Sequence, residues 1–258
     1  MSRGLQGHVV LVSGGTQGVG AGIARASAQA GATVVITGRR PDVGERAAAE
    51  LRQHGEALFL PADVADVASA QGSVAATVER FGRVDGLVNA AGLTTRGTLL
   101  DTTPELFAEH VAVNLRAPFF LMQAAVADMV HRGEPGSVVN IISMSAHGGQ
   151  PYLAPYVATK AGLIGLTRNA AYAHRWDRVR INGINMGWTQ TEGEDATQRQ
   201  FHGASDDWAA RAGATLPMGR LSQVEDIAAL AVLLLSPASG VVTGSVIDWD
   251  QQMPGAHD

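Results

Sequence analysis

The chain has 258 residues, a formal net charge of −5, 46% hydrophobic and 17% charged residues, and no cysteine. This length and composition suit one folded α/β domain and argue against a disordered chain. The absence of cysteine excludes disulfides, thiolate zinc ligands and a cysteine nucleophile, and no basic tract indicates a nucleic-acid surface. The eight histidines are scattered without metal-ligand spacing, so we expect no metal site.

Apolar runs of strand length alternate with alanine-rich helical stretches along the whole chain. The expected strands cover residues 9–12, 33–37, 57–60, 84–88, 137–142, 180–184 and 245–248. The expected helices lie near residues 19–30, 43–54, 67–81, 104–131, 155–176 and 224–235. Buried strands separated by helices predict a parallel sheet of about seven strands, covered on both faces, in a doubly wound Rossmann-type α/β fold. Such a fold binds its ligand at the carboxyl ends of the strands.

No repeat or linker marks a second domain, so residues 1–258 are predicted to form one unit. Residues 191–217 break the alternation, because they are polar, contain three glycines and carry isolated aromatic residues. A loop this long is either a lid or a disordered insertion, and the aromatic residues favour a substrate lid. The apolar run 227–235 is half the length needed to cross a bilayer and no signal peptide is evident, so we expect no membrane contact and a cytoplasmic location.

The first strand leads into a glycine-rich turn, Ser13-Gly14-Gly15-Thr16-Gln17-Gly18-Val19-Gly20, directly before a helix. Glycines permit a tight turn and let a pyrophosphate approach the backbone, where the N–H groups of the helix N-terminus meet its charge. The motif alone could also be a turn that binds nothing.

Tyr156 and Lys160 are four residues apart and therefore share one face of a helix. A free tyrosine has a pKa of ~10, and a nearby cation favours the phenolate. Bringing this pKa close to neutral requires ~4 kcal/mol of differential stabilisation. The pair alone is a weak signal, because many helices carry this spacing without a function.

Further motifs occur at fixed places relative to this pair. Ser143 ends the fifth strand thirteen residues before Tyr156, Asn114 lies in the long central helix, and Asn89-Ala90-Ala91-Gly92 follows the fourth strand. In order and spacing these motifs resemble the short-chain dehydrogenase/reductase family, with similarity to 3-oxoacyl-reductase-like ketoreductases over about residues 5–250. The resemblance implies an NAD(P)-dependent oxidoreductase that transfers a hydride between a nicotinamide cofactor and a ketone or secondary alcohol.

The resemblance also implies the catalytic roles. Ser143 would hydrogen-bond the substrate oxygen, and Tyr156 would act as the general acid/base. Lys160 would lower the tyrosine pKa and hold the nicotinamide ribose, and Asn114 would position water that links Lys160 to solvent. Ser143 could instead be a strand-end cap, with Ser145 as the rival candidate.

The expected cofactor contacts come from the strand ends and from the site helix. They are Gly14, Thr16, Gln17, Gly18, Val19, Gly20, Arg39, Arg40, Asp63, Val64, Asn89, Ala90, Gly92, Tyr156, Lys160, Gly187, Thr189 and Thr191. Arg39 and Arg40 end the second strand with no carboxylate before Asp42, which favours NADP(H) over NAD(H), because Arg39 can bond a 2′-phosphate. Solvated arginines are the alternative, and Gln17 stands where many NADP-dependent relatives have a basic residue. Asp63 would contact adenine unless it is only a helix N-cap.

The substrate is expected to be a ketone or secondary alcohol with an apolar or aromatic group. Its walls would come from the lid and from residues near the catalytic group, namely Leu93, Ser143, His147, Tyr152 and Trp188. His147 could equally be a solvated loop residue.

Several positions depart from the family pattern. Met186 replaces the proline that usually precedes Gly187, which leaves the backbone of that turn less restricted. Trp249-Asp250-Gln251-Gln252 stands where Asp-Gly-Gly is usual, Ala90 replaces an asparagine, and Ser13 replaces a threonine.

The sequence argues against two other functions. A divergent branch of enoyl reductases has its tyrosine seven positions before the lysine, where this chain has Leu153. A non-catalytic dinucleotide-binding regulatory protein would be expected to have lost a catalytic group, and all four are present.

Relatives pack the helices around Asn114 and Tyr156 between subunits, so a homotetramer is expected, although a core within one chain would explain the apolar runs 117–130 and 161–166 equally well.

Overall fold

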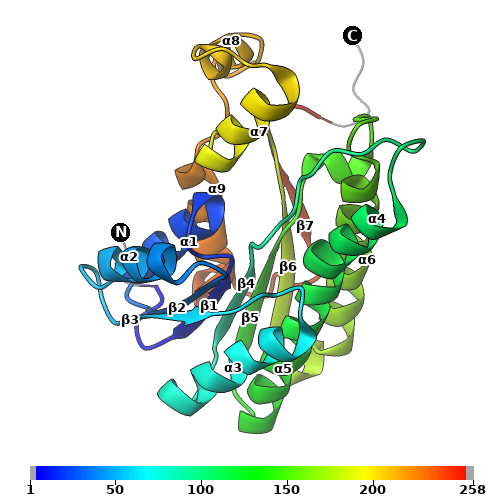
Figure 1. Cartoon of the computed structure of the whole chain (residues 1–258). Helices are drawn as coiled ribbons and strands as arrows, with labels where there is room; N and C mark the ends of the chain where they lie inside the picture. The colour runs from blue at the N-terminus through cyan, green and yellow to red at the C-terminus, as the bar shows by residue number, and fades with distance from the viewer. Residues whose placement is uncertain (1–3, 254–258) are drawn as a thin grey trace.

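The computed structural model describes residues 4–253 and contains one seven-stranded, wholly parallel sheet (Figure 1). The strands are β1 (Val9–Ser13), β2 (Thr33–Gly38), β3 (Ala57–Pro61), β4 (Gly86–Asn89), β5 (Gly136–Ile141), β6 (Val179–Met186) and β7 (Val246–Trp249). The helices are α1 (Gly18–Gln29), α2 (Pro41–Leu51), α3 (Val67–Phe81), α4 (Pro104–Val111), α5 (Ala117–Arg132), α6 (Ala154–Ala173), α7 (Glu192–His202), α8 (Trp208–Ala214) and α9 (Val224–Leu235).

Each face of the sheet carries its own hydrophobic core. Val10 and Val12 of β1 join α1, α2 and α9 in one core, whereas Leu11 between them joins α3, α5 and α6 in the other. Side chains alternate between the faces of a strand, so a continuous apolar strand can serve both cores. The expected doubly wound fold is confirmed.

The strand order is β3-β2-β1-β4-β5-β6-β7, so the winding direction reverses between β1 and β4. Ser13 at the end of β1 pairs with Thr37 of β2 on one side and with Asn89 of β4 on the other. The reversal separates the loops that leave β1 and β4 and opens a crevice at their carboxyl ends.

The predicted helix 104–131 is interrupted. α4 and α5 are joined by a π-helical turn at Ala112–Arg116, which contains Asn114. A π-turn adds one residue to a single turn without ending the helix, so the stretch still has the composition of one long helix. Such turns are frequent at functional sites.

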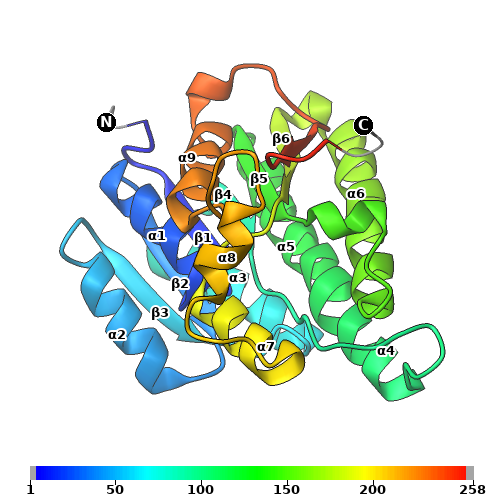
Figure 2. The same cartoon turned by 90° about the horizontal axis from the view of Figure 1, so that it is seen from above.

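The prediction of a loop at 191–217 is wrong, because the segment contains α7 and α8. Thr191 caps α7 by accepting a hydrogen bond from Glu194 N at 3.0 Å. Acidic residues occupy the first turn of α7 and basic residues its last turn, which suits the helix dipole. Figures 1 and 2 show the two helices lying across the carboxyl ends of the central strands.

Within residues 4–253, no helix is both long enough and apolar enough to span a membrane.

Candidate active site

A cleft of about 1340 Å³ is lined by residues at the carboxyl ends of the central strands and by Glu194, Gln198 and His202 of α7. Figure 2 shows α7 lying over these strand ends. The glycine-rich turn after β1 lines one end, and Ser143, Tyr156 and Lys160 line the other. The cleft therefore joins two motifs that lie far apart in the sequence, residues 13–20 and 143–160.

The glycine-rich turn is packed too closely for side chains. Gly14 has a φ of +74°, and a Cβ there would lie 2.6 Å from the Ala91 backbone. A Cβ on Gly20 would lie 2.2 Å from the Gly14 carbonyl oxygen. Glycine is thus required for the conformation at Gly14 and for the close approach of helix to turn at Gly20.

The residues around this turn fit a nicotinamide dinucleotide. α1 begins at Gly18, and its N-cap residue Gln17 makes no capping hydrogen bond, so the first helical N–H groups face the cleft without a side-chain acceptor. A Cβ on Gly92 would meet only Asn114 Oδ1, at 3.8 Å, so the backbone here is open to a flat group. A pyrophosphate at the turn and a nucleoside beside Gly92 suit this cradle.

Arg39 and Arg40 both line the far end of the cleft and are exposed. Arg40 Nη2 donates to Gln17 Oε1 at 2.5 Å, which joins the end of β2 to the glycine-rich turn. Asp63 also lines the cleft, and its Oδ1 accepts from Ala65 N at 3.0 Å. The N-cap of α3 is Asp66, so the alternative role of Asp63 as that cap is wrong.

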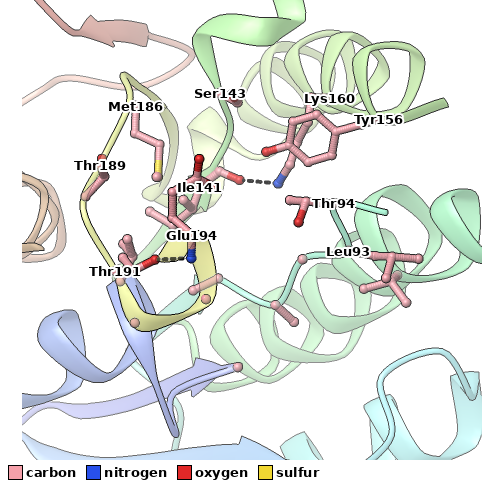
Figure 3. A pocket seen from close by; sticks show the side chains of 18 of the residues that line it. Leu93, Thr94, Ile141, Ser143, Tyr156, Lys160, Met186, Thr189, Thr191 and Glu194 are labelled. Carbon is pink, nitrogen blue, oxygen red and sulfur yellow. Dashed lines mark hydrogen bonds between the residues drawn. The ribbon is translucent and has the colours of Figure 1, made fainter. Parts of the chain in front are cut away.

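Three of the predicted catalytic side chains meet at the carboxyl end of β5. Figure 3 shows the Lys160 amine directed at the Ile141 carbonyl, with the Tyr156 ring beside it and Ser143 nearby. Lys160 Nζ donates to Ile141 O at 2.8 Å and lies 5.6 Å from the centre of the Tyr156 ring. Lys160 is the only lysine in the sequence and is 4% exposed.

Burial favours the neutral forms of both groups. It raises the pKa of Tyr156 to about 12, against the opposing effects of a hydrogen bond from Ser143 and the charge of Arg96. Burial lowers the pKa of Lys160 to about 8. In the protein without a cofactor the net effect on the Tyr156 pKa is upward, so the phenol holds its proton at neutral pH, and the lowering by Lys160 stays a prediction.

Ser143 and Ser145 differ in how their hydroxyls are used. Ser143 caps the 3-10 turn Met144–His147 by accepting from Ser145 N at 3.2 Å, and its own hydroxyl donates toward Tyr156. Ser145 Oγ instead donates to Gln150 Oε1 at 2.6 Å. Both line the cleft, and the geometry favours Ser143 as the hydrogen-bond donor to a substrate.

Asn114 lies behind the cleft wall and is fully buried. Its Oδ1 accepts from Leu93 N at 2.8 Å, and its Nδ2 donates to Leu93 O at 2.9 Å. The π-turn thus presents this amide to the backbone of the loop after β4. Asn114 supports the wall that carries Leu93 and does not itself line the cleft.

Two other predicted site residues are not among those that line the cleft. Asn89 is buried, and its Nδ2 donates to Asn140 Oδ1 at 2.7 Å across β4 and β5. His147 turns toward the sheet edge, where its Nε2 lies 2.9 Å from Asn185 Nδ2 and 3.3 Å from Asp248 Oδ1. Asn89 therefore joins strands, and His147 holds β6 and β7 together.

The substrate side of the cleft is more polar than the sequence indicated. Leu93, Tyr152 and Trp188 line it as predicted, together with Arg96, Gln150, Glu194, Gln198 and His202. Arg96 lies over the Tyr152 ring at 5.3 Å, and its Nη2 is 3.2 Å from His202 Nε2, which ties the end of α7 to the opposite wall. Only their closeness to motif residues could have pointed to Arg96 and Glu194 in the sequence. Arg96 lies four residues after Gly92, and Glu194 lies three residues after Thr191.

The unusual C-terminal motif has a structural use. A Cβ on Gly187 would lie 2.1 Å from Asp250 Oδ1, so the tail packs directly on the turn after β6. Gln251 Nε2 donates to Arg220 O at 2.8 Å, and Gln251 Oε1 accepts from Met218 N at 2.7 Å. These bonds tie the tail to the segment after α8.

Thr189, Thr191 and Met186 line the cleft near this turn. Thr189 Oγ1 donates to Gly187 O at 3.0 Å, which restrains the turn where proline is missing. Within residues 4–253, no three His, Cys, Asp or Glu side chains are grouped so that they could hold a metal ion.

Comparison with known proteins identifies the family. A family model described as enoyl-(acyl carrier protein) reductase matches residues 14–252. An NADP-dependent (R)-specific alcohol dehydrogenase of Lentilactobacillus kefiri is 34% identical over 247 residues, covering 95% of this chain and 96% of the relative. An L-rhamnose 1-dehydrogenase (NAD(P)(+)) of Azotobacter vinelandii is 35% identical over 243 residues, covering 92% of each. The crystal structure of levodione reductase is 30% identical with a TM-score of 0.90, covering 96% of this chain and 97% of the other.

The fold and the site define a nicotinamide-dependent oxidoreductase. The chain belongs to the short-chain dehydrogenase/reductase family and transfers a hydride between a nicotinamide cofactor and an alcohol or ketone.

Although the family model is described by enoyl reduction, Leu153 stands where the divergent enoyl reductases have their tyrosine. Leu153 is 5% exposed and is the N-cap residue of α6, and it has no proton to transfer.

Proposed function

We propose that the protein interconverts a ketone and a secondary alcohol, with Tyr156 as the general acid/base. The observation that carries the proposal is the meeting of the Tyr156 phenol, the Ser143 hydroxyl and Lys160 in the cleft that also holds the glycine-rich turn. A bound nicotinamide supplies the hydride in ketone reduction and accepts it in alcohol oxidation. The chain's own residues then have to hold the carbonyl and move one proton.

In the reductive direction, Tyr156 donates its phenolic proton to the carbonyl oxygen as negative charge develops there. Ser143 donates a hydrogen bond to the same oxygen, and Lys160 binds the nicotinamide ribose from its place beside Ile141 O. Because burial raises the pKa of Tyr156 to about 12, the phenol is protonated at neutral pH and can act as an acid at once. Asn114 does not touch the substrate but holds the Leu93 backbone that forms part of the cleft wall. That Asn114 also positions water between Lys160 and solvent is a separate prediction.

The test is Tyr156→Phe, which removes the transferable proton and keeps the ring. We expect at least ~100-fold lower turnover with unchanged cofactor affinity, because positioned proton transfer contributes ~10²–10⁴ in rate. The matched control is Tyr172→Phe, since Tyr172 is 69% exposed on the same helix. Near-normal turnover by the Tyr156 variant would remove it from this role.

The proposal extends to NADP(H) as the favoured cofactor. Arg39 and Arg40 line the cleft end where a 2′-phosphate would lie, and no carboxylate ends β2. The similar L. kefiri enzyme is named as NADP-dependent, whereas the A. vinelandii enzyme is named with NAD(P). One charge-assisted bond would favour NADP(H) by roughly 10- to 100-fold.

Dissociation constants for NADPH and NADH test this preference. Arg39→Ala should weaken NADPH binding and leave NADH binding nearly unchanged. Arg46→Ala is the control, because Arg46 is exposed on α2 and pairs with Asp42 at 3.9 Å. Equal or tighter binding of NADH by the unaltered protein would overturn the choice.

We also propose a homotetramer built on the α4–α5 and α6 faces, which would bury an apolar groove. Val111, Leu115, Phe119, Phe120 and Leu166 line this groove, and Phe119 is 45% exposed in the single chain. The cytoplasmic location and the movement of α7 and α8 as a substrate lid stay predictions, to be tested by cell fractionation and by hydrogen exchange with and without cofactor.

A further inference from the structure

A buried histidine lies behind the catalytic groups and has no part in the mechanism above. His110 is 0% exposed, on the last turn of α4, one turn before Asn114. Both of its ring nitrogens have partners: Nδ1 lies 3.2 Å from Asn114 Nδ2, and Nε2 lies 3.0 Å from Thr95 O.

These two partners determine the tautomer. A backbone carbonyl can only accept, so Nε2 of His110 must carry a proton and donate it to Thr95 O. A side-chain amide nitrogen can only donate, so Nδ1 must be bare and accept from Asn114 Nδ2. The ring is therefore neutral in this arrangement.

The same contact determines which way the Asn114 amide points. Asn114 Nδ2 faces three acceptors, Leu93 O at 2.9 Å, His110 Nδ1 at 3.2 Å and Thr159 Oγ1 at 3.4 Å, while Oδ1 accepts from Leu93 N. Rotating the amide by half a turn would set Nδ2 against Leu93 N, donor against donor. The bare Nδ1 of His110 thus favours the one orientation that grips Leu93 through both backbone groups.

His110 also reaches the catalytic tyrosine and the substrate wall. Its ring meets the Tyr156 ring edge-on, with centres 6.4 Å apart and planes at 78°. Its bond to Thr95 O holds the segment between Leu93 and Arg96, both of which line the cleft. One imidazole therefore connects α4, the loop after β4 and the acid/base residue on α6.

We propose that His110 is a positioning residue for hydride transfer. Its ring must be the neutral Nε2–H tautomer to keep Asn114, residues 93–96 of the cleft wall and Tyr156 in their observed places. This inference rests on the proposed function of the same site, but the geometry on which it depends can be measured without turnover.

Protonation would break this arrangement. A second proton on Nδ1 would face the N–H of Asn114, and neither amide orientation can then satisfy both His110 and Leu93. The titratable and charged groups that act on or meet the ring are Glu109 on its own helix and Tyr156 from α6. Burial lowers the pKa of His110 below its ordinary value of 6.5, so the neutral form is the one present at neutral pH.

The first test is nitrogen-15 NMR of the imidazole in the protein without cofactor. The expected result is a neutral His110 with its proton on Nε2 at neutral pH, and protonation only below ~6.5. A charged ring, or a proton on Nδ1, would overturn the inference even if the enzyme proves active. A failure of the proposed function would instead appear as absent turnover with the NMR result unchanged.

The second test is the pH profile of kcat in two variants. His110→Gln offers one donor and one acceptor that do not titrate, so it should keep kcat within about threefold at neutral pH and lose the acid limb of the parent. His110→Leu offers neither and should lose about tenfold in kcat at every pH, the equivalent of one lost buried hydrogen bond. An unchanged acid limb in His110→Gln, or full kcat in His110→Leu, would show that the ring only fills space. His131→Gln, on the exposed end of α5, is the control and should leave the profile unchanged.

Discussion

The buried ammonium of Lys160 should cost the fold stability, and replacing Lys160 with methionine should recover part of it. Burial lowers the pKa of Lys160 from 10.5 to about 8, which corresponds to about 3 kcal/mol against the charged form. Methionine has similar length and no charge, but it leaves the Ile141 carbonyl without the 2.8 Å bond from Nζ, at a cost of about 1–2 kcal/mol. We expect Lys160→Met to be about 1–2 kcal/mol more stable at neutral pH and inactive.

The pH dependence separates this cause from simple repacking. The folded-state pKa of Lys160 lies below the unfolded-state value, so between about 8 and 10.5 the unfolded chain binds more protons. The stability of the parent should therefore rise with pH through this window as the penalty disappears, and the advantage of the methionine variant should shrink and then reverse. Below about pH 8 the difference should stay constant.

Thermal unfolding without cofactor, at matched protein concentration, measures the effect. A gain of 1 kcal/mol corresponds to about 2–4 °C in Tm for a chain of this size. Arg168→Met is the control, because Arg168 is exposed on the same helix. Because Lys160 is the only lysine, carbon-13 labelling of lysine yields one side-chain signal whose titration reports its pKa directly. A signal that titrates near 10.5, or a variant less stable than the parent at neutral pH, would refute the reasoning.

Three further predictions concern other parts of the molecule. Ser143→Ala should lose at least ~100-fold in turnover and Ser145→Ala less than ~10-fold, and steady-state kinetics showing the reverse ranking would transfer the role to Ser145. Asp85→Ala should cost about 3–5 kcal/mol in urea unfolding, because its 1% exposed carboxylate accepts from Val9 N at 2.9 Å and pairs with Arg83 at 2.7 Å, whereas Glu50→Ala in an exposed pair should cost less than ~1. Phe119→Glu should split the proposed tetramer, and light scattering that finds the same mass for parent and variant would contradict the proposed interface.

Local pattern was enough to predict the sheet and the reactive pair. Val10, Leu11 and Val12 form a continuous apolar run, and the structure places Leu11 in one core and the two valines in the other. The four-residue spacing of Tyr156 and Lys160 put both on one helix face by geometry alone. Gly14 and Gly20 were recognisable for a similar reason, since the close approach they permit follows from the spacing of the turn itself.

Contacts between distant segments could not be read in the same way. Asn89 belongs to a sequence motif and His147 lies four residues after Ser143, but the structure pairs them with Asn140 and with Asp248, far along the chain. The helix α7 was missed because its polar sequence has no apolar stripe, and its stability comes from the Thr191 cap and from contacts such as that of Arg96 with His202. His110 gave no signal, because its role depends on a π-turn that shifts Asn114 relative to it.

Burial shifts the pKa values of the two reactive groups in opposite directions, but in both cases it favours the neutral form. It raises the pKa of Tyr156 and lowers that of Lys160, so each is pushed toward its neutral form. A neutral phenol is ready to donate a proton to a ketone, whereas oxidation of an alcohol first requires the phenolate. The protein without a cofactor thus holds Tyr156 in its proton-donating form, and the positive charge that stabilises a phenolate has to come from a protonated Lys160 or from the oxidised nicotinamide. The stability lost by burying the only lysine follows from placing that charge where it can act on Tyr156.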